Sequence, residues 1–390
     1  MIWSQLYLKT NPLLRKTSVL IAILVLLSLA ALAVPTVAPL LIGDRVPPLE
    51  PDVKWIKGEP VLEFKPGQVY ILDLWGTWCA PCLADLPHMN AIAKKYRERG
   101  VTLVAVAIDP GAAFPPSEFV RRKGDQMDFV VGEEINGRME SRFKDALGNI
   151  RFPTIAIIDR QGRLAWMGQG YPIYGFDAAL EQIVAGKYDM EAAVKESQRR
   201  HAIKLKALPL VKPLEERWDA GNYKEALPIV RQLVALDPGM FGMEAYSAFL
   251  KMQRQASKDE AFAFAQEVVD KLLTANDPDL AWPLSSLAQS LTYVPTRQGP
   301  TLKSPIEPRE LELAFKAAQR ANALLGGKEP WRLEILAMVY YAKGDLKQAL
   351  TFISDAVKQA EEQHWGTEEL EKLRKRLSLY QEVASRNEKK

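Results

Sequence analysis

The chain of 390 residues contains only two cysteines, Cys79 and Cys82, and their setting restricts its fold more than any other feature. The apolar run 69–74 leads into the segment 75–82, which has the composition of a strand end, a sharp turn and a helix start. The partial positive charge of a helix N-terminus favours the thiolate of Cys79. The two-residue spacing lets the second sulfur attack a mixed disulfide formed on the first. The pattern therefore predicts a redox-active dithiol.

Two other readings of the cysteine pair are weaker. A structural zinc site would normally need four ligands, and the chain offers no second cysteine pair and only scattered histidines, His88, His201 and His364. A purely structural disulfide would rarely close so short a loop, because the gain in entropy is small. We therefore expect neither a metal nor an organic cofactor.

Several positions outside the cysteine pair carry a resemblance to a known family. Pro87 lies eight residues after Cys79, the segments 43–49 and 159–163 have the expected opening and turn compositions, and Phe152-Pro153 precedes an apolar run. Over residues 43–188 the chain resembles the thioredoxin superfamily, most closely its membrane-anchored thiol-disulfide reductase branch of the TlpA and ResA type. The resemblance implies an α/β thioredoxin fold.

The resemblance also implies roles for single residues. Cys79 would be the attacking nucleophile and the more exposed thiol, and Cys82 the buried, resolving thiol. The 151–154 segment would form a cis-proline loop that faces the cysteines. The residues expected to contact substrate are Trp78, Pro81, Phe152, Pro153 and Thr154.

Two acids near the cysteines are candidates for proton transfer. Asp73, six residues before Cys79, matches a buried acid of thioredoxins, and its apolar neighbours favour burial, which raises a carboxyl pKa; the alternative is an ordinary strand acid. Asp85 stands where this branch usually carries glutamate. Its side chain is one methylene shorter, so a solvated helix acid is an equal alternative.

The direction of the chemistry is less constrained. Gly76 occupies the place where a peroxiredoxin needs threonine, which argues against that family. Ala80-Pro81 between the thiols resembles the reductase members of the superfamily. An oxidase or isomerase would use the same residues at a higher potential and stays open.

The N-terminal 42 residues predict a membrane anchor. Residues 19–42 are apolar and uncharged, which is long enough to span a bilayer. Lys9, Arg15 and Lys16 precede them and place a short N-terminus, 1–17, in the cytoplasm. The expected anchor is 18–42, with a signal peptide cleaved near 31–33 as the alternative. Either way the dithiol faces the periplasm or the cell exterior, where disulfides persist.

The pattern of apolar residues divides the rest of the chain. Alternating strands and helices are expected over 43–188: strands at 69–74, 101–108, 154–158 and 164–167, and helices at 82–99, 118–123, 136–144 and 176–185. Strand signals vanish after residue 188. We expect a helical linker at 189–207.

Helix-forming residues dominate 208–390, with weak internal repetition. Ala226 and Ala261 are 35 residues apart, as are Ala314 and Ala349, with an apparent insertion near 292–308. This resembles degenerate tetratricopeptide repeats (TPR), and a generic helical bundle is the alternative. Stacked helix pairs suit the binding of a protein or peptide.

Together these features predict a membrane-anchored, extracytoplasmic thiol-disulfide reductase joined to an all-α, TPR-like partner-binding domain. The net charge of +3 is too slight to suggest nucleic acid. The resemblance implies disulfide-containing exported proteins, apocytochromes c among them, as substrates, and a transmembrane dithiol carrier as electron donor. A helical-repeat scaffold that the cysteine pair only stabilises or regulates is the other function class left open.

Overall fold

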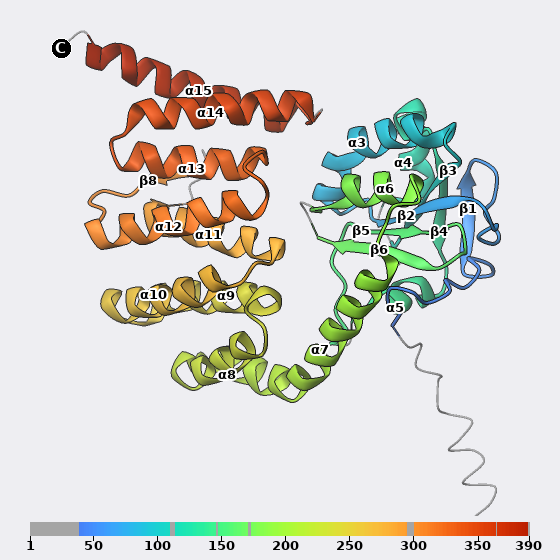
Figure 1. Ribbon diagram of the computed structural model, residues 1–390, viewed down its shortest axis with the longest axis horizontal. Helices are drawn as coiled ribbons and strands as arrows, with labels where there is room; N and C mark the ends of the chain where they lie inside the picture. Colours follow the sequence, from blue (N-terminus) through green and yellow to red (C-terminus); the bar gives the residue numbers. More distant parts are fainter. Residues whose placement is uncertain are drawn as a thin grey trace, which may run out of the picture. The chain divides into compact units, whose positions relative to one another are not determined.

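The computed structural model describes residues 39–109, 114–145, 147–170, 173–294, 300–363 and 365–388 (Figure 1). The predicted cytoplasmic N-terminus and residues 18–38 of the predicted anchor lie outside these ranges. Within them, no helix has the length and apolar character needed to cross a membrane.

The last residues of the predicted anchor belong to the folded part of the chain. The backbone N–H of Leu40 donates to the carbonyl oxygen of Arg142 (2.9 Å), and that of Ile42 donates to the hydroxyl of Ser197 (3.2 Å). Leu40 and Ile42 also pack against a buried apolar cluster. These residues are not helical, because their apolar side chains are used in a protein core.

The first module is built on a six-stranded mixed sheet with the order β1-β4-β3-β2-β5-β6. Strand β2 runs parallel to β3 and antiparallel to β5. This is the thioredoxin-like α/β arrangement that the sequence predicted. Its elements are β1 (Val53–Lys57), β2 (Val69–Trp75), α3 (Ala80–Arg97), β3 (Val101–Ala107), α4 (Pro116–Lys123), η1 (Gly124–Met127), β4 (Val130–Glu134), α5 (Arg138–Phe143), β5 (Thr154–Ile158), β6 (Leu164–Gln169) and α6 (Phe176–Val184).

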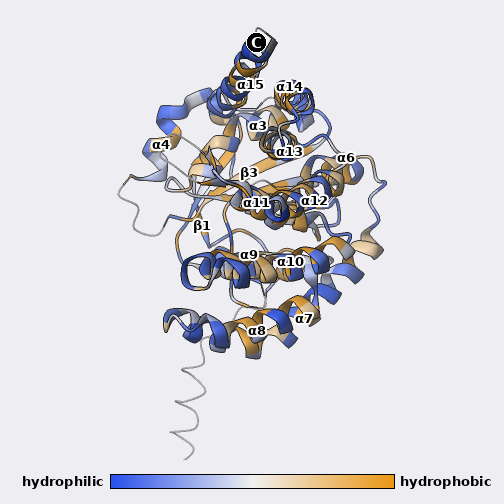
Figure 2. Cartoon of the chain, turned by 90° about the vertical axis from the view of Figure 1, so that its left-hand side faces the viewer, coloured by the Kyte–Doolittle hydropathy of each residue, from blue (hydrophilic) through white to orange (hydrophobic). Residues whose placement is uncertain are grey.

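Strand β2 is buried at every position because both faces of the sheet are covered. Val69, Ile71 and Trp75 belong to a cluster that includes residues of α3 and α6, whereas Leu72 and Leu74 belong to another on the opposite face. Side chains alternate between the faces of a strand, so Asp73 lies on the α3 face. Figure 2 shows the neighbouring strand β3 almost entirely in the colour of apolar residues.

The predicted strands and helices of this module are found within a few residues, but β1 and β4 were missed. Both are short and carry charged residues, so neither shows a continuous apolar run. The close approach of the two strands depends on Gly132, where an added Cβ would lie 2.3 Å from a methyl group of Val53. The segment 43–49 pairs with the turn after β5, as the backbone N–H of Val46 donates to the carbonyl oxygen of Gly162 (3.0 Å).

The second module consists mainly of helices, as predicted. Successive helices lie beside one another in Figure 1, and the pairs α8–α9, α11–α12 and α13–α14 are in contact. Most of these helices have a buried apolar face and an exposed polar face (Figure 2), whereas α13 has no exposed residue and Trp282 is the one exposed residue of α11. The elements are α7 (Met190–Asp219), α8 (Tyr223–Leu236), α9 (Pro238–Gln255), α10 (Lys258–Thr274), η2 (Pro278–Leu280), α11 (Ala281–Thr292), β7 (Tyr293–Val294), β8 (Thr301–Leu302), α12 (Pro308–Leu324), α13 (Pro330–Ala342), α14 (Leu346–Glu362) and α15 (Thr367–Glu388).

The repeated alanines lie where helices approach one another. Ala226, Ala314 and Ala349 are fully buried, and Ala261 is 4% exposed. The expected insertion near 292–308 contains the small antiparallel pair β7–β8. The expectation that no strand follows residue 188 was therefore wrong, because backbone pairing formed there without an extended apolar run.

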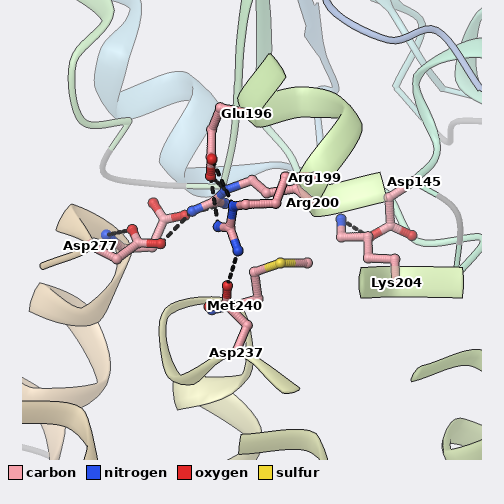
Figure 3. Close-up of polar contacts among 9 residues, drawn as sticks. Asp145, Glu196, Arg199, Arg200, Lys204, Asp237, Met240 and Asp277 are labelled. Carbon is pink, nitrogen blue, oxygen red and sulfur yellow. Dashed lines mark hydrogen bonds and ion pairs between the residues drawn. The ribbon is translucent and has the colours of Figure 1, made fainter. Parts of the chain in front are cut away.

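Helix α7 continues twelve residues beyond the linker expected at 189–207 and is held on both sides by ion pairs (Figure 3). Near the redox module, Lys204 pairs with Asp145 (Nζ to Oδ2, 2.6 Å). Near the helical module, Arg199 pairs with Asp237 (2.6 Å), and Arg200 reaches Asp277 (2.5 Å). Asp237 also caps α9 by accepting a hydrogen bond from the backbone N–H of Met240, so one carboxylate serves two elements.

Replacing Arg200 with alanine should destabilise the helical module by about 1–3 kcal/mol, because the partly buried carboxylate of Asp277 loses its cation. The measurement is the free energy of unfolding from urea denaturation followed by far-UV circular dichroism. Lys212, an exposed cation on the same helix with one distant partner, supplies the control. K212A should change stability by no more than about 0.5 kcal/mol, and equal losses for both variants would contradict the importance of the α7 ion pairs.

Candidate active site

The two cysteines lie at the end of β2, where the chain turns into α3. Cys79 is the N-cap residue of α3, and its sulfur accepts a hydrogen bond from the backbone N–H of Cys82 (3.2 Å). The two sulfurs are joined in a disulfide, with the Cα atoms 5.3 Å apart. The strand, turn and helix start predicted from the sequence are all present. The free backbone N–H groups and the dipole of α3 favour negative charge on Cys79 once the bond is reduced.

Both cysteines are buried in this oxidised form, Cys79 at 3% and Cys82 at 4% exposure. The predicted contrast between an exposed Cys79 and a buried Cys82 is therefore not present here, because one disulfide holds both sulfurs in the same apolar cluster. The neighbouring Trp78 is 59% exposed, and Pro81 is exposed as well. These two predicted substrate-contacting residues lie on the surface beside the disulfide.

The turn before Cys79 is held by residues that follow β3, the strand that ends beside β2. Asp109, directly after this strand, accepts a hydrogen bond from the backbone N–H of Thr77 (2.8 Å). The indole N–H of Trp78 donates to the carbonyl oxygen of Ile108 (3.3 Å). An added Cβ at Gly76 would lie 2.6 Å from that indole, so only glycine lets the Trp78 ring fold back in this way.

The predicted cis-proline loop reaches the same edge of the sheet. Strand β5 is antiparallel to β2, and Thr154 lies opposite Leu74 in the register, so the start of β5 is beside the end of β2. The Phe152–Pro153 peptide is cis. The Phe152 ring packs edge-on against Trp78, with centroids 5.2 Å apart. Thr154 is fully buried and its hydroxyl donates to the carbonyl oxygen of Arg151 (2.6 Å), so only its backbone could face a substrate.

Asp73 is buried beneath the active-site helix, as the sequence predicted. It is 5% exposed, and its Oδ1 has no hydrogen-bond partner. Burial is the main cause that raises the pKa of this carboxyl to about 8, and the negative charge of Asp85 raises it further. A carboxyl that titrates near pH 8 can give and take a proton under physiological conditions.

Asp85 is largely shielded rather than solvated, with its side chain 15% exposed. Its Oδ1 lies 3.3 Å from Nδ1 of His88, and Nε2 of His88 lies 3.1 Å from Oδ1 of Asp177. Burial disfavours the charged imidazolium, but the hydrogen bonds to Asp177 and Asp85 outweigh it and raise the pKa of His88 to about 10. The alternative of a solvated helix acid is therefore a poor description of Asp85.

Sequence reasoning missed three residues of this site: His88, Asp109 and Asp177. Asp109 could have been found, since it lies two residues after β3, the strand that pairs in parallel with β2. His88 and Asp177 are 89 residues apart, and no sequence pattern links them. Among the described residues, no group of three or more His, Cys, Asp and Glu side chains is arranged to hold a metal ion.

Residues 60–183 match the Redoxin family model. The chain is 22% identical over 210 residues to protein FixW of Rhizobium leguminosarum, covering 50% of this chain and 91% of FixW. It is 33% identical over 106 residues to the thiol-disulfide oxidoreductase ResA of Oceanobacillus iheyensis, covering 27% of this chain and 50% of ResA. These matches support a thiol-disulfide oxidoreductase.

The Redoxin match ends at residue 183, before the helical module begins. The chain spans about half the length of this ResA relative. Among solved structures, StoA from Bacillus subtilis matches with a TM-score of 0.27 and 22% identity, covering 33% of this chain and 92% of StoA.

Replacing Asp73 with asparagine should make the oxidised protein more stable relative to wild type as the pH rises. The folded protein keeps the Asp73 proton up to pH about 8, whereas the unfolded chain loses it near pH 3.8. Wild type therefore loses stability through this group between those values, and D73N does not. Urea denaturation should show the difference between D73N and wild type growing by on the order of 3 kcal/mol from pH 4 to pH 7.

D125N is the control for the loss of one negative charge, because Asp125 of η1 is exposed. It should stay within about 0.5 kcal/mol of wild type at both pH values. A D73N difference that does not change with pH would mean that Asp73 is ionised in the folded protein.

Proposed function

We propose that this protein is an extracytoplasmic thiol-disulfide reductase that acts on exported proteins through Cys79 and Cys82. The observation that supports it most is the placement of both cysteines at the start of α3, with Asp73 buried in the preceding strand and Phe152 of the cis-Pro153 loop packed against Trp78. The Redoxin match over residues 60–183 and the ResA relatives agree with this chemistry.

The reaction consists of two exchanges. The thiolate of reduced Cys79 attacks one sulfur of a substrate disulfide, forming a mixed disulfide and releasing the other substrate sulfur as a thiolate. The thiolate of Cys82 then attacks Sγ of Cys79, which frees the second substrate sulfur and leaves the Cys79–Cys82 disulfide. The substrate gains two electrons, and a dithiol carrier must supply two electrons to restore the protein.

Asp73 is suited to accept the proton that Cys82 must lose before it attacks. Its carboxyl lies on the same face of the sheet as both cysteines and titrates near neutrality. Exposed Trp78 and Pro81, with the backbone around cis-Pro153, would bind the substrate chain beside the buried sulfurs.

We also propose where the dithiol is located in the cell and what the second module does. The apolar segment 19–38 and the lysine and arginine residues before it favour a membrane anchor with the dithiol outside the cytoplasm. The paired helices of α8 to α15 are consistent with a TPR-like scaffold that selects protein partners. Trp282, 37% exposed and in ring contact with Trp331, is the kind of side chain that such surfaces use.

Single cysteine variants test the chemistry. C79S should lower the rate of insulin disulfide reduction at least about 100-fold, because the attacking thiolate is removed. C82S should accumulate mixed disulfides with substrate proteins, since the resolving thiol is gone. These should appear as extra bands on non-reducing gels and disappear when dithiothreitol reduces them. Undiminished turnover by C79S would overturn the assignment. A measured reduction potential near that of strong oxidants would instead indicate an oxidase.

The two modules should be separable. The buried members of the sheet's apolar clusters lie within residues 46–184, whereas those of the helical clusters begin at Ala207, with the partly buried Leu147 and Ile203 packed against them. A fragment of residues 39–206 keeps the part of α7 that contacts Ile42 and should reduce insulin at a rate within about threefold of the full chain. It should lose its preference for the natural partners. A folded fragment that lacks both activities would mean that the helical module completes the active site.

A further inference from the structure

His88 joins the active-site helix to α6 through two carboxylates. It lies one turn after Asp85 on α3, directly after Pro87, and its Nδ1 and Nε2 atoms lie against Asp85 and Asp177 respectively. The imidazole is also perpendicular to the ring of Phe176, with centroids 6.1 Å apart. The ring is therefore fixed from two helices.

The geometry fits a protonated ring. A neutral imidazole has one donor and one acceptor nitrogen, and the acceptor would face a carboxylate oxygen without a hydrogen. An imidazolium carries a hydrogen on both nitrogens, so it can donate to Asp177 and form an ion pair with Asp85. The raised pKa of His88 agrees with this state.

Among the described contacts, His88 has no carboxylate partner other than Asp85 and Asp177. On α6, the next acid, Glu181, is held by Arg99 (2.8 Å) and by the hydroxyl of Tyr96 (2.6 Å). On β2, Asp73 interacts with Asp85 through charge. The charged groups that determine the titration of Asp73 and His88 are therefore Asp85 and Asp177.

We propose that His88 is a positioning residue of the dithiol site, which holds the Asp85 carboxylate in place, where its charge acts on Asp73, by bridging it to Asp177 on α6. This rests on the proposed function, because the proton of Asp73 matters for exchange only if the cysteines react. Without His88, the bridge that ties the Asp85 carboxylate to α6 is lost, so this carboxylate can turn toward solvent. That turn moves a negative charge away from Asp73.

The test is the titration of Asp73 in the oxidised full-length protein, measured by NMR from the ¹³C chemical shift of its side-chain carboxyl. The Asp73 signal is assigned as the one that is missing from the spectrum of D73N. Wild type should show a midpoint near pH 8. H88Q should lower it by about half to one pH unit, because the repulsion from Asp85 is weakened. If the His88 cation instead acted directly on Asp73, its loss would raise the midpoint. The direction of the change therefore separates a direct effect of His88 from an effect through Asp85.

Two further variants make the result specific. H88R keeps a cation with several donors and should retain the wild-type midpoint. In a D85N background, H88Q should cause no further change. The inference is overturned if folded H88Q titrates like wild type or with a raised midpoint, if H88R and H88Q behave alike, or if H88Q still lowers the midpoint without Asp85. If H88Q does not fold, a lowered midpoint in folded H88R overturns the inference, and a wild-type midpoint supports it.

The pH dependence of insulin reduction separates this inference from the proposed function. In H88Q the rate profile should move in the same direction as the Asp73 midpoint. A wild type that reduces no disulfide at any pH would refute the proposed function while leaving the bridge intact. An active wild type whose titration does not respond to H88Q would refute only the bridge.

Discussion

The burial of β2 is the constraint on which the site depends. A strand covered on both faces must satisfy its backbone through neighbouring strands, and β3 and β5 do so along almost its whole length. The one acid in this strand is thereby taken out of water. The same pairing brings the ends of three strands together, so the cysteine turn, Asp109 and the cis-Pro153 loop meet at one edge. The chemistry of the site follows from a packing requirement.

Burial has opposite consequences for the two ionisable groups at this edge. Burial keeps Asp73 neutral, whereas His88 is kept charged because two carboxylates outweigh the same effect. Asp85 lies between them and influences both. The site thus contains one buried carboxyl that titrates near pH 8 and one histidine that stays charged at that pH. Such a division suits a reaction in which protons must move without disturbing the surrounding fold.

Much of this could be predicted from the sequence, since its signals are local. The apolar run before Cys79 predicts β2, the Ala80-Pro81 dipeptide predicts a helix start, and the family resemblance at Phe152-Pro153 implies the cis loop; all three are present. Strands β1 and β4 were not predicted because both are short and carry charged residues, so neither shows a continuous apolar run. The His88–Asp177 contact was not predicted because it depends on how α6 packs against α3. Contacts between residues so far apart in the chain produce no recognisable spacing in the sequence.

The alanines between the helices of the second module set a limit of another kind. Ala245, Ala248, Ala317 and Ala321 are as fully buried as the repeated Ala226, so at these points the packing between helices includes only a methyl side chain. Any larger side chain at these points must separate two backbones, and a packed interior yields little to such a change. The outer faces have no such restriction. Over evolutionary time the surface of this module is therefore free to diverge while the distances between its helices stay constant, and a new binding preference can arise on an unchanged frame.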